Sequence, residues 1–177
     1  MNVKKTFCII LLFLILFSTI TFVSADDDRS YTINQAFIDL TVGNDGLLHV
    51  DEKYDYAFDG AFNGVYRDIP LKSGERIENI KVSANGAYPV LKESDDNGYK
   101  HLKIYLYSDV AYTKGIKDCD VTVYISYDIT NVVTLFNDVG ELQYKLWGEE
   151  WDVGVGSLTA KIHLPGDKEN EYFLNPC

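Results

Sequence analysis

Apolar and polar residues alternate along most of the chain, a pattern typical of β-strands with one buried face. The alternation is clearest from Leu48 to Phe58, where every second residue lies on one predicted face: Leu48, Val50, Glu52, Tyr54, Tyr56 and Phe58. Residues 36–42 alternate in the same way, and Gly43-Asn44-Asp45-Gly46 supplies a turn between the two segments. The sequence therefore predicts a β-hairpin over residues 36–58.

The rest of the chain repeats this pattern at short intervals. Further strands are predicted at residues 80–84, 88–92, 102–106, 121–129 and 158–164. The strand beginning at Val121 is expected to continue through Val133 and to end near Asn137. No amphipathic helix of ordinary length is found, although residues 141–147 and 151–155 fit no pattern clearly. The predicted fold is an all-β antiparallel β-sandwich, immunoglobulin-like in its general architecture.

One residue of the first hairpin conflicts with this pattern. Glu52 falls on the apolar face, between Val50 and Tyr54. A buried carboxylate must find a partner or take up a proton, because an unpaired buried charge is very costly. Arg67 is the nearest candidate partner, since its guanidinium can bind a carboxylate through two donors. We expect a structural ion pair; the alternative is an acid of raised pKa in a pocket.

Arg67 belongs to an unusual stretch, residues 54–70, which combines five aromatic residues with two glycines, an arginine and a proline. We expect this stretch to open as a strand, to break at Gly60 and Gly64, and to form a packed loop. The loop is interpreted mainly as a corner of the sandwich that the ion pair holds in place. A binding role for its exposed tip, Phe62 and Asn63, is also left open.

The N-terminus resembles a secretory leader. Two lysines precede an uncharged run from Thr6 to Ala25, and Val23-Ser24-Ala25 provides the small residues of a cleavage site. The alternative is an uncleaved signal anchor, because twenty uncharged residues can span a bilayer. Residues 1–25 are therefore predicted to be a signal peptide or signal anchor. Residues 26–177 are predicted to form one extracytoplasmic domain that is secreted or membrane-associated, and either whole or truncated at its C-terminus.

Charge and cysteine content limit the partners of this domain. Without the two leader lysines, 14 basic and 27 acidic residues give a net charge of −13, which disfavours nucleic acid as a partner. Cys119 and Cys177 could form a disulfide in an oxidising compartment. Cys119 lies on the apolar face of its strand, however, where a buried free thiol also fits.

Few residues suggest chemistry. Trp147 and Trp151 flank three carboxylates in residues 147–152, which could stack on a sugar and hydrolyse it. Adjacent glutamates point apart in an extended chain, however, so we expect a turn whose tryptophans cover one end of the core. Aspartate-rich turns could bind calcium but lack the spacing of an EF-hand loop. The histidines are expected at the surface, and neither a metal site nor a cofactor is predicted.

Several motifs together resemble a known family. They are Val50-Asp51-Glu52, Phe58-Asp59-Gly60, Asn63 to Pro70, Trp147-Gly148, Trp151-Asp152 and Ile162-His163-Leu164-Pro165. The Gly-Val-Tyr-Arg-Asp-Ile-Pro run at 64–70 is the most specific. The chain thus resembles the domain of unknown function 2207 family of predicted membrane proteins. The resemblance implies a β-rich extracytoplasmic domain at the N-terminus of a membrane-anchored protein, and it transfers no catalytic residue.

These observations favour a non-catalytic interaction or structural module, attached to a membrane through the N-terminal segment or a missing C-terminal region. Its partner would be an unidentified protein or glycan. The alternatives are a glycan-active enzyme that uses residues 147–152 and a calcium-dependent adhesion module.

Overall fold

The computed structural model describes residues 29–148 and 150–166. The predicted leader at 1–25 lies outside the described residues, and so does Cys177. The described chain is built from β-strands and contains no helix: β1 (Ser30–Val42), β2 (Leu48–Phe62), β3 (Gly64–Pro70), β4 (Arg76–Asn85), β5 (Tyr88–Asp96), β6 (Tyr99–Tyr107), β7 (Ile116–Thr130), β8 (Val133–Leu135), β9 (Gly140–Leu142) and β10 (Leu158–His163). The predicted all-β fold is confirmed.

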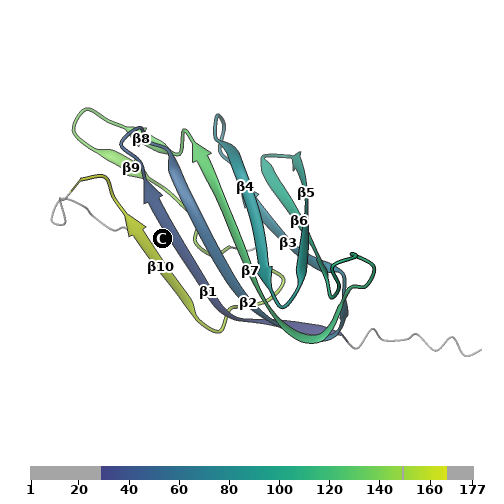
Figure 1. Cartoon of the computed structure of the whole chain (residues 1–177). Coiled ribbons are helices and arrows are strands. Elements are labelled where there is room, and N and C mark those ends of the chain that lie inside the picture. The colour runs from purple at the N-terminus through teal and green to yellow at the C-terminus, as the bar shows by residue number, and fades with distance from the viewer. Residues whose placement is uncertain (1–28, 149, 167–177) are drawn as a thin grey trace, which may run out of the picture.

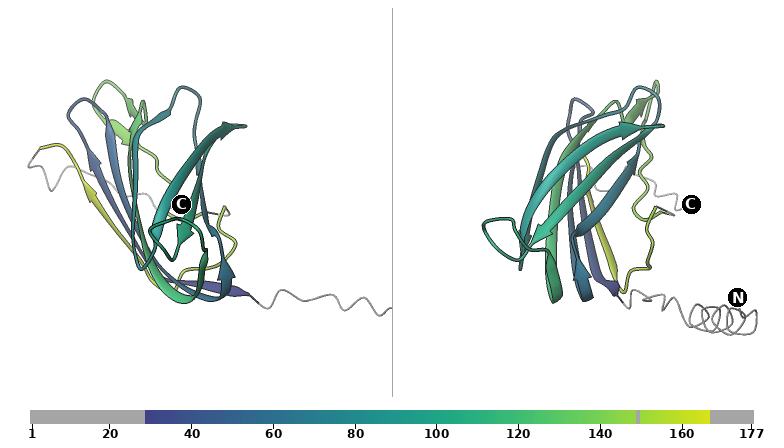
Figure 2. Two further views of the ribbon diagram at one scale, coloured as in Figure 1. Left: turned by 45° about the vertical axis from the view of Figure 1, so that its right-hand side comes forward. Right: turned by 90° about the vertical axis from the view of Figure 1, so that its right-hand side faces the viewer.

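The strands form two main sheets that pack as layers. The larger sheet has the order β10-β1-β2-β7-β4, and the smaller has the order β3-β6-β5 (Figure 1). In the turned views of Figure 2 the smaller sheet lies across one face of the larger one. A separate two-stranded hairpin, β8-β9, follows β7 at the end of the molecule where β1 and β7 finish.

The hydrophobic core lies between the layers, and alternation determines which side chains enter it. From the smaller sheet, Leu102, Ile104 and Leu106 of β6 are fully buried. They face apolar residues of the larger sheet, which come mainly from alternate positions of β1, β2 and β7. The positions predicted to face inward on residues 48–58 are all buried, Glu52 included.

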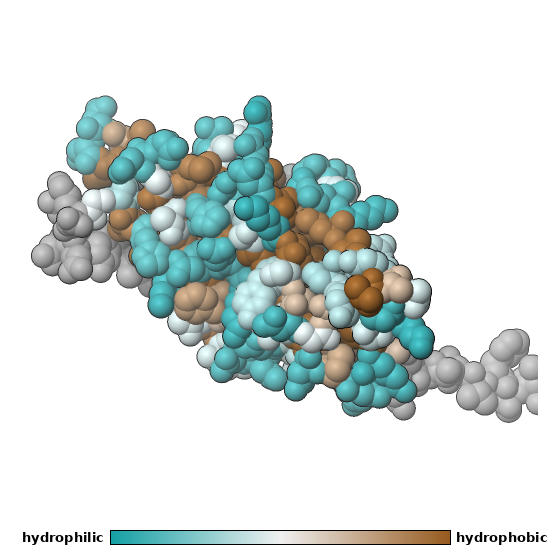
Figure 3. Space-filling model, in the orientation of Figure 1, coloured by the Kyte–Doolittle hydropathy of each residue, from teal (hydrophilic) through white to brown (hydrophobic). Residues whose placement is uncertain are grey.

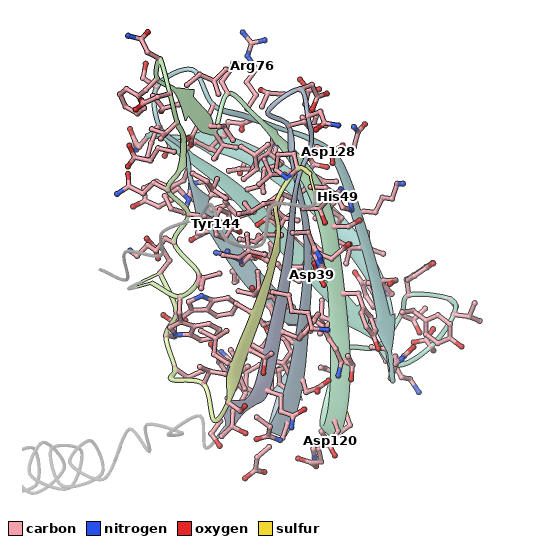
Figure 4. All side chains as sticks on the ribbon, turned by 90° about the vertical axis from the view of Figure 1, so that its left-hand side faces the viewer. Asp39, His49, Arg76, Asp120, Asp128 and Tyr144 are labelled. Atoms are coloured by element: carbon pink, nitrogen blue, oxygen red, sulfur yellow. The ribbon has the colours of Figure 1, made fainter. Side chains whose placement is uncertain are left out.

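The opposite face of the larger sheet is polar. On this face His49 Nδ1 lies 2.7 Å from Asp128 Oδ1, and His163 Nε2 lies 2.8 Å from Asp39 Oδ1. Figure 3 shows many hydrophilic residues on this side, with hydrophobic ones among them, and Figure 4 shows His49, Asp128 and Asp39 on the side away from Tyr144. All three histidines of the described residues are at least partly exposed, as alternation indicated.

The expectation of a packed loop within residues 54–70 is wrong. The chain stays in strands: β2 extends to Phe62 and pairs with β7, and β3 begins at Gly64 and pairs with β6 along its whole length. Gly60, with φ of 89°, lies in a bulge of β2. Gly64 is where the chain crosses between sheets, and a Cβ there would collide with the Ile104 carbonyl oxygen. Gly60 therefore accommodates a bulge and Gly64 a close approach between strands, and neither glycine opens a loop.

Two other elements differ from expectation. β7 ends at Thr130 and does not continue to Asn137, because Asn131 adopts a positive φ of 59° and the chain turns into the β8-β9 hairpin. β10 pairs with β1 in parallel, the one parallel strand pair among the described residues. Alternation predicts which residues share a face, but it carries no information on the direction of the neighbouring strand.

The described residues between β9 and β10, 143–148 and 150–157, cover the inner face of the larger sheet where the smaller sheet does not reach; we call them the 143–157 segment. Several of their side chains are half-buried against the core: Tyr144, Leu146, Trp147, Trp151, Val153 and Val155. Figure 4 shows this segment, with Tyr144, on the opposite side of the strands from His49. The segment brings Tyr144 and both tryptophans to the interior face that holds Glu52.

Candidate functional site

The site begins with Glu52, which β2 directs into the core. Its two strand neighbours are Ile38 of β1 and Ile125 of β7, so the carboxylate is surrounded by the centre of the larger sheet. Only 2% of Glu52 is exposed. A carboxylate in this position needs several donors to replace the water it has lost.

Arg67 supplies two of these donors from the other sheet. Its Nε donates to Glu52 Oε2 over 3.0 Å, and its Nη2 donates to Glu52 Oε1 over 2.8 Å. A third group, Nη1, donates to the Asp68 carbonyl oxygen over 2.7 Å. Arg67 is itself 5% exposed. This two-donor ion pair joins β2 to β3 and therefore the larger sheet to the smaller one.

Two tyrosines complete the shell around the carboxylate. The Tyr127 hydroxyl of β7 donates to Glu52 Oε1 over 2.8 Å, and the Tyr144 hydroxyl lies 3.3 Å from the same oxygen. The two hydroxyls are 2.7 Å apart, so they are also linked to each other. Four side chains from β2, β3, β7 and the 143–157 segment thus form one buried network. We call Glu52, Arg67, Tyr127 and Tyr144 the Glu52 network.

Electrostatics favour a charged pair in this network. Burial acts to raise the pKa of Glu52, but the charge and hydrogen bonds of Arg67 and the Tyr127 hydrogen bond lower that pKa below its usual range. Burial acts to lower the pKa of Arg67, but the Glu52 charge raises it well above its ordinary value. Burial first, and then the Glu52 charge, raise the pKa of Tyr127, which stays protonated and can donate. The site is therefore an ionised pair between neutral hydroxyls.

The tryptophans close the site from the side of the 143–157 segment. The Trp147 and Trp151 rings stack with centroids 4.4 Å apart and planes within 6°. The guanidinium carbon of Arg67 lies 5.3 Å from the Trp151 ring centroid, at cation–π distance, and the Tyr54 ring centroid is 4.8 Å from that of Trp151. The indoles are half-buried and pack on the core and on Arg67.

One buried polar group of the site is unpaired. The Tyr54 hydroxyl has no hydrogen-bond partner among the described residues, although Tyr54 is fully buried. Burial, and then the charge of Glu52, raise its pKa well above the ordinary value, which keeps the hydroxyl neutral. Tyr54 therefore places a neutral hydroxyl beside the ion pair, whereas the hydroxyls of Tyr127 and Tyr144 are hydrogen-bonded to Glu52.

The remaining predicted site residues lie elsewhere. Phe62 is half-buried and packs on the rings of Tyr31 and Phe58, so the expectation of an exposed tip holds only for Asn63. Cys119 is half-buried on β7 and forms no disulfide within the described part of the chain. The proposed disulfide with Cys177 involves a residue outside the described part of the chain. Sequence reasoning missed Tyr127 and Tyr144, since nothing in the sequence indicates that either hydroxyl faces Glu52.

Few other groups of side chains in the described residues are arranged for chemistry. Within residues 29–148 and 150–166, no three His, Cys, Asp or Glu side chains are grouped so as to hold a metal ion. An open depression of about 500 Å³ lies between the β3–β4 and β5–β6 connections, lined by residues such as Lys72, Glu75, Asp95 and Tyr99. Its lining does not include the Glu52 network.

The outer face of the smaller sheet is rich in exposed tyrosine. Tyr66 of β3 and Tyr88 of β5 are 61% and 45% exposed. Lys103 of β6 lies between Tyr66 and Tyr105, with its Nζ 5.2 Å and 4.7 Å from the two ring centroids. We call Tyr66, Tyr88, Lys103 and Tyr105 the tyrosine face. It is separated from the Glu52 network by the thickness of the smaller sheet.

The comparisons with known proteins identify a family but no activity. The family model described as "Predicted membrane protein (DUF2207) N-terminal domain" matches residues 32–176, which confirms the resemblance seen in the sequence motifs. No curated protein matches the chain. No helix of the described residues is both long and apolar enough to cross a membrane.

The solved structures that match are only distantly similar. A mutant M1 zinc metallopeptidase from Deinococcus radiodurans shares 12% identity over 55% of this chain, with a TM-score of 0.39. The native yeast LTA4 hydrolase shares 9% identity over 55% of the chain, with a TM-score of 0.35. A putative protease from Parabacteroides distasonis shares 10% identity over 56%, with a TM-score of 0.29. The matches cover 20%, 14% and 22% of those proteins.

Proposed function

The chain belongs to the DUF2207 family of predicted membrane proteins, and from this membership we propose that residues 26–177 form a non-catalytic, extracytoplasmic domain of a membrane-associated protein. The domain serves as an interaction or structural module. The leader-like residues 1–25 support the extracytoplasmic placement, because a signal peptide or signal anchor exports the chain that follows it.

The observation that carries the non-catalytic proposal is the saturation of Glu52. Both carboxylate oxygens accept hydrogen bonds from the protein itself, and the residue is fully enclosed. A general acid or nucleophile needs access to a substrate and a pKa suited to proton transfer. Glu52 of the larger sheet instead has a lowered pKa and binds Arg67 of the smaller sheet. We therefore assign the Glu52 network the role of a clamp between the two sheets.

A glycan screen tests this function against the rival enzyme interpretation. The purified chain and its Trp151→Ala variant are incubated with a panel of surface polysaccharides, and both binding and released sugars are measured. We expect no release by either protein. Release by the wild-type chain that Trp151→Ala abolishes, while far-UV circular dichroism shows that the variant is folded, would establish a glycan-active enzyme and overturn the proposal.

Glycan binding without cleavage is a second candidate function, and the tyrosine face is the observation that favours it. Exposed tyrosine rings supply flat apolar surface together with a hydroxyl, which suits a neutral polysaccharide. Binding at this face would be weakened by Tyr66→Ala and Tyr88→Ala but not by Trp151→Ala. The opposite pattern would place the glycan at the indoles and exclude the tyrosine face.

A calcium-dependent adhesion role is tested more simply. The aspartates of the three predicted turns are far apart in the fold: Asp45 lies between β1 and β2, Asp138 lies between β8 and β9, and Asp95 lies near the end of β5. We expect the same melting temperature in excess calcium and in a chelator. A rise in melting temperature with calcium would favour the adhesion interpretation.

A further inference from the structure

The β8-β9 hairpin presents apolar side chains to solvent. Leu135 is 81% exposed, Phe136 56% and Val139 58%, although all three lie within five consecutive residues. The hairpin is closed by a hydrogen bond of 2.8 Å from the Phe136 amide to the Val139 carbonyl oxygen, so its tip is an ordered turn. We call residues 135–139 the apolar tip. Exposed apolar clusters of this kind mark contact with a partner or a membrane.

The strand registers place the apolar tip at a definite end of the molecule. β8 begins three residues after Thr130, the last residue of β7. The same end holds the finish of β10, because His163 pairs with Thr41 near the end of β1. The last described strand, β10, therefore ends at the same end of the molecule as the apolar tip. Figure 1 shows β8, β9 and the arrowheads of β1 and β10 together.

The opposite end of the molecule carries a rival apolar loop. Ser30 begins β1 there, and Phe62 pairs with Ile116 at the start of β7. The β6–β7 connection at this end exposes Val110 and Tyr112. A membrane that contacts the domain through one end cannot contact it through the other, so the two loops are alternatives.

We propose that the apolar tip is the membrane-contacting surface of the domain, and that Leu135, Phe136 and Val139 insert into the interfacial region of a lipid bilayer. The inference rests on the proposed membrane association and adds an orientation to it. The family model describes the N-terminal domain of a predicted membrane protein, so the rest of such a protein follows this domain. β10, the last described strand, ends beside the apolar tip, and we therefore place the membrane on that side of the domain.

The charges around the apolar tip specify the kind of lipid. Asp138 within the tip and Glu141 on β9 are both exposed. Anionic head groups would be repelled by these carboxylates, whereas burial of apolar side chains does not depend on lipid charge. The tip should therefore insert into zwitterionic phosphatidylcholine, with little dependence on salt.

Site-specific fluorescence on the full chain tests the proposal. Cys8, Cys119 and Cys177 are replaced by serine, and a polarity-sensitive fluorophore is attached to a single new cysteine at Phe136→Cys or, as the matched control, at Tyr112→Cys. Each labelled chain is mixed with phosphatidylcholine vesicles, and vesicle flotation shows how much chain is bound. Circular dichroism verifies that both labelled chains are folded.

We expect the fluorophore at position 136 to shift to shorter wavelength and to be quenched by brominated phosphatidylcholine, whereas the one at 112 does neither. Adding Leu135→Ser and Val139→Ser should reduce the shift at 136. Chain that floats while position 136 stays unquenched, or while 112 is quenched in its place, overturns the orientation but leaves membrane association intact. Absence of flotation would instead overturn the membrane association on which both proposals rest.

Discussion

The Glu52–Arg67 pair should be strongly coupled in its contribution to stability. Glu52→Gln would leave a buried guanidinium without its counter-charge, and Arg67→Met would leave a buried carboxylate with hydrogen bonds from tyrosine hydroxyls but no counter-charge. Removing one partner of a buried ion pair typically costs about 3–5 kcal/mol of unfolding free energy. The double variant has no unpaired charge. It should therefore be more stable than the sum of the single losses indicates, by about 2 kcal/mol or more.

Urea unfolding of the four proteins measures this coupling. Far-UV circular dichroism is the suitable probe, because Trp151 stacks over Arg67 and its fluorescence would respond to the substitution itself. Lys145 and Glu150 provide a control cycle: their ion pair spans 3.1 Å, but the Lys145 side chain is half exposed. Coupling in the control should be no more than about 0.5 kcal/mol. If the losses at Glu52 and Arg67 simply add, the two residues do not act as a clamp.

Three further predictions concern pH and backbone geometry. Because the pKa of Glu52 is lowered in the folded state, ionised Glu52 contributes to folding stability at pH values above its ordinary pKa of 4.5. This contribution is lost as the pH falls through the folded-state pKa. The difference in unfolding free energy between wild type and Glu52→Gln should therefore shrink in acid. The pKa of His49 is raised, first by its hydrogen bond to Asp128. Protonated His49 therefore contributes to folding stability below pH 6.5, and this contribution is lost as the pH rises through the raised pKa. The melting temperature of the wild type should change more between about pH 6 and pH 8 than that of His49→Gln. Gly64→Ala would push a Cβ against the carbonyl oxygen of β6 and should cost more than about 2 kcal/mol, whereas Gly154→Ala, with nothing within 4 Å, should cost less than about 0.5 kcal/mol in the same urea assay. Equal losses at the two glycines would contradict the close approach described at residue 64.

The strands and their buried faces could be predicted because alternation with a period of two depends on local sequence alone. The same reasoning placed Glu52 inside, and the chemistry of a buried carboxylate then selected Arg67 as the partner to examine. The structure has the two in contact at 2.8 Å and 3.0 Å. The fold class and the centre of the site could therefore be predicted from the sequence.

The rest of the site depends on long-range geometry that local patterns do not encode. Tyr127 lies 75 residues from Glu52 in sequence, and Tyr144 lies 92 residues away. Tyr144 and Trp151 reach the core only because an irregular segment crosses the uncovered part of the larger sheet, and irregular segments have no periodicity from which to predict burial. The aromatic and glycine content of residues 54–70 suggested a loop for a similar reason. The glycines accommodate a bulge and a close strand crossing that become visible only when β6 and β7 are in place.

The most direct test of the clamp is the ionisation of Glu52 itself. A carbon-13 NMR titration of the side-chain carboxyl, assigned by comparison with Glu52→Gln, would follow this one group as the pH is lowered. We predict that Glu52 remains ionised at neutral pH and that its pKa lies below the ordinary value of 4.5, held there by Arg67 and Tyr127. A pKa near or above neutrality would contradict this account and identify Glu52 as a protonated acid available for proton transfer.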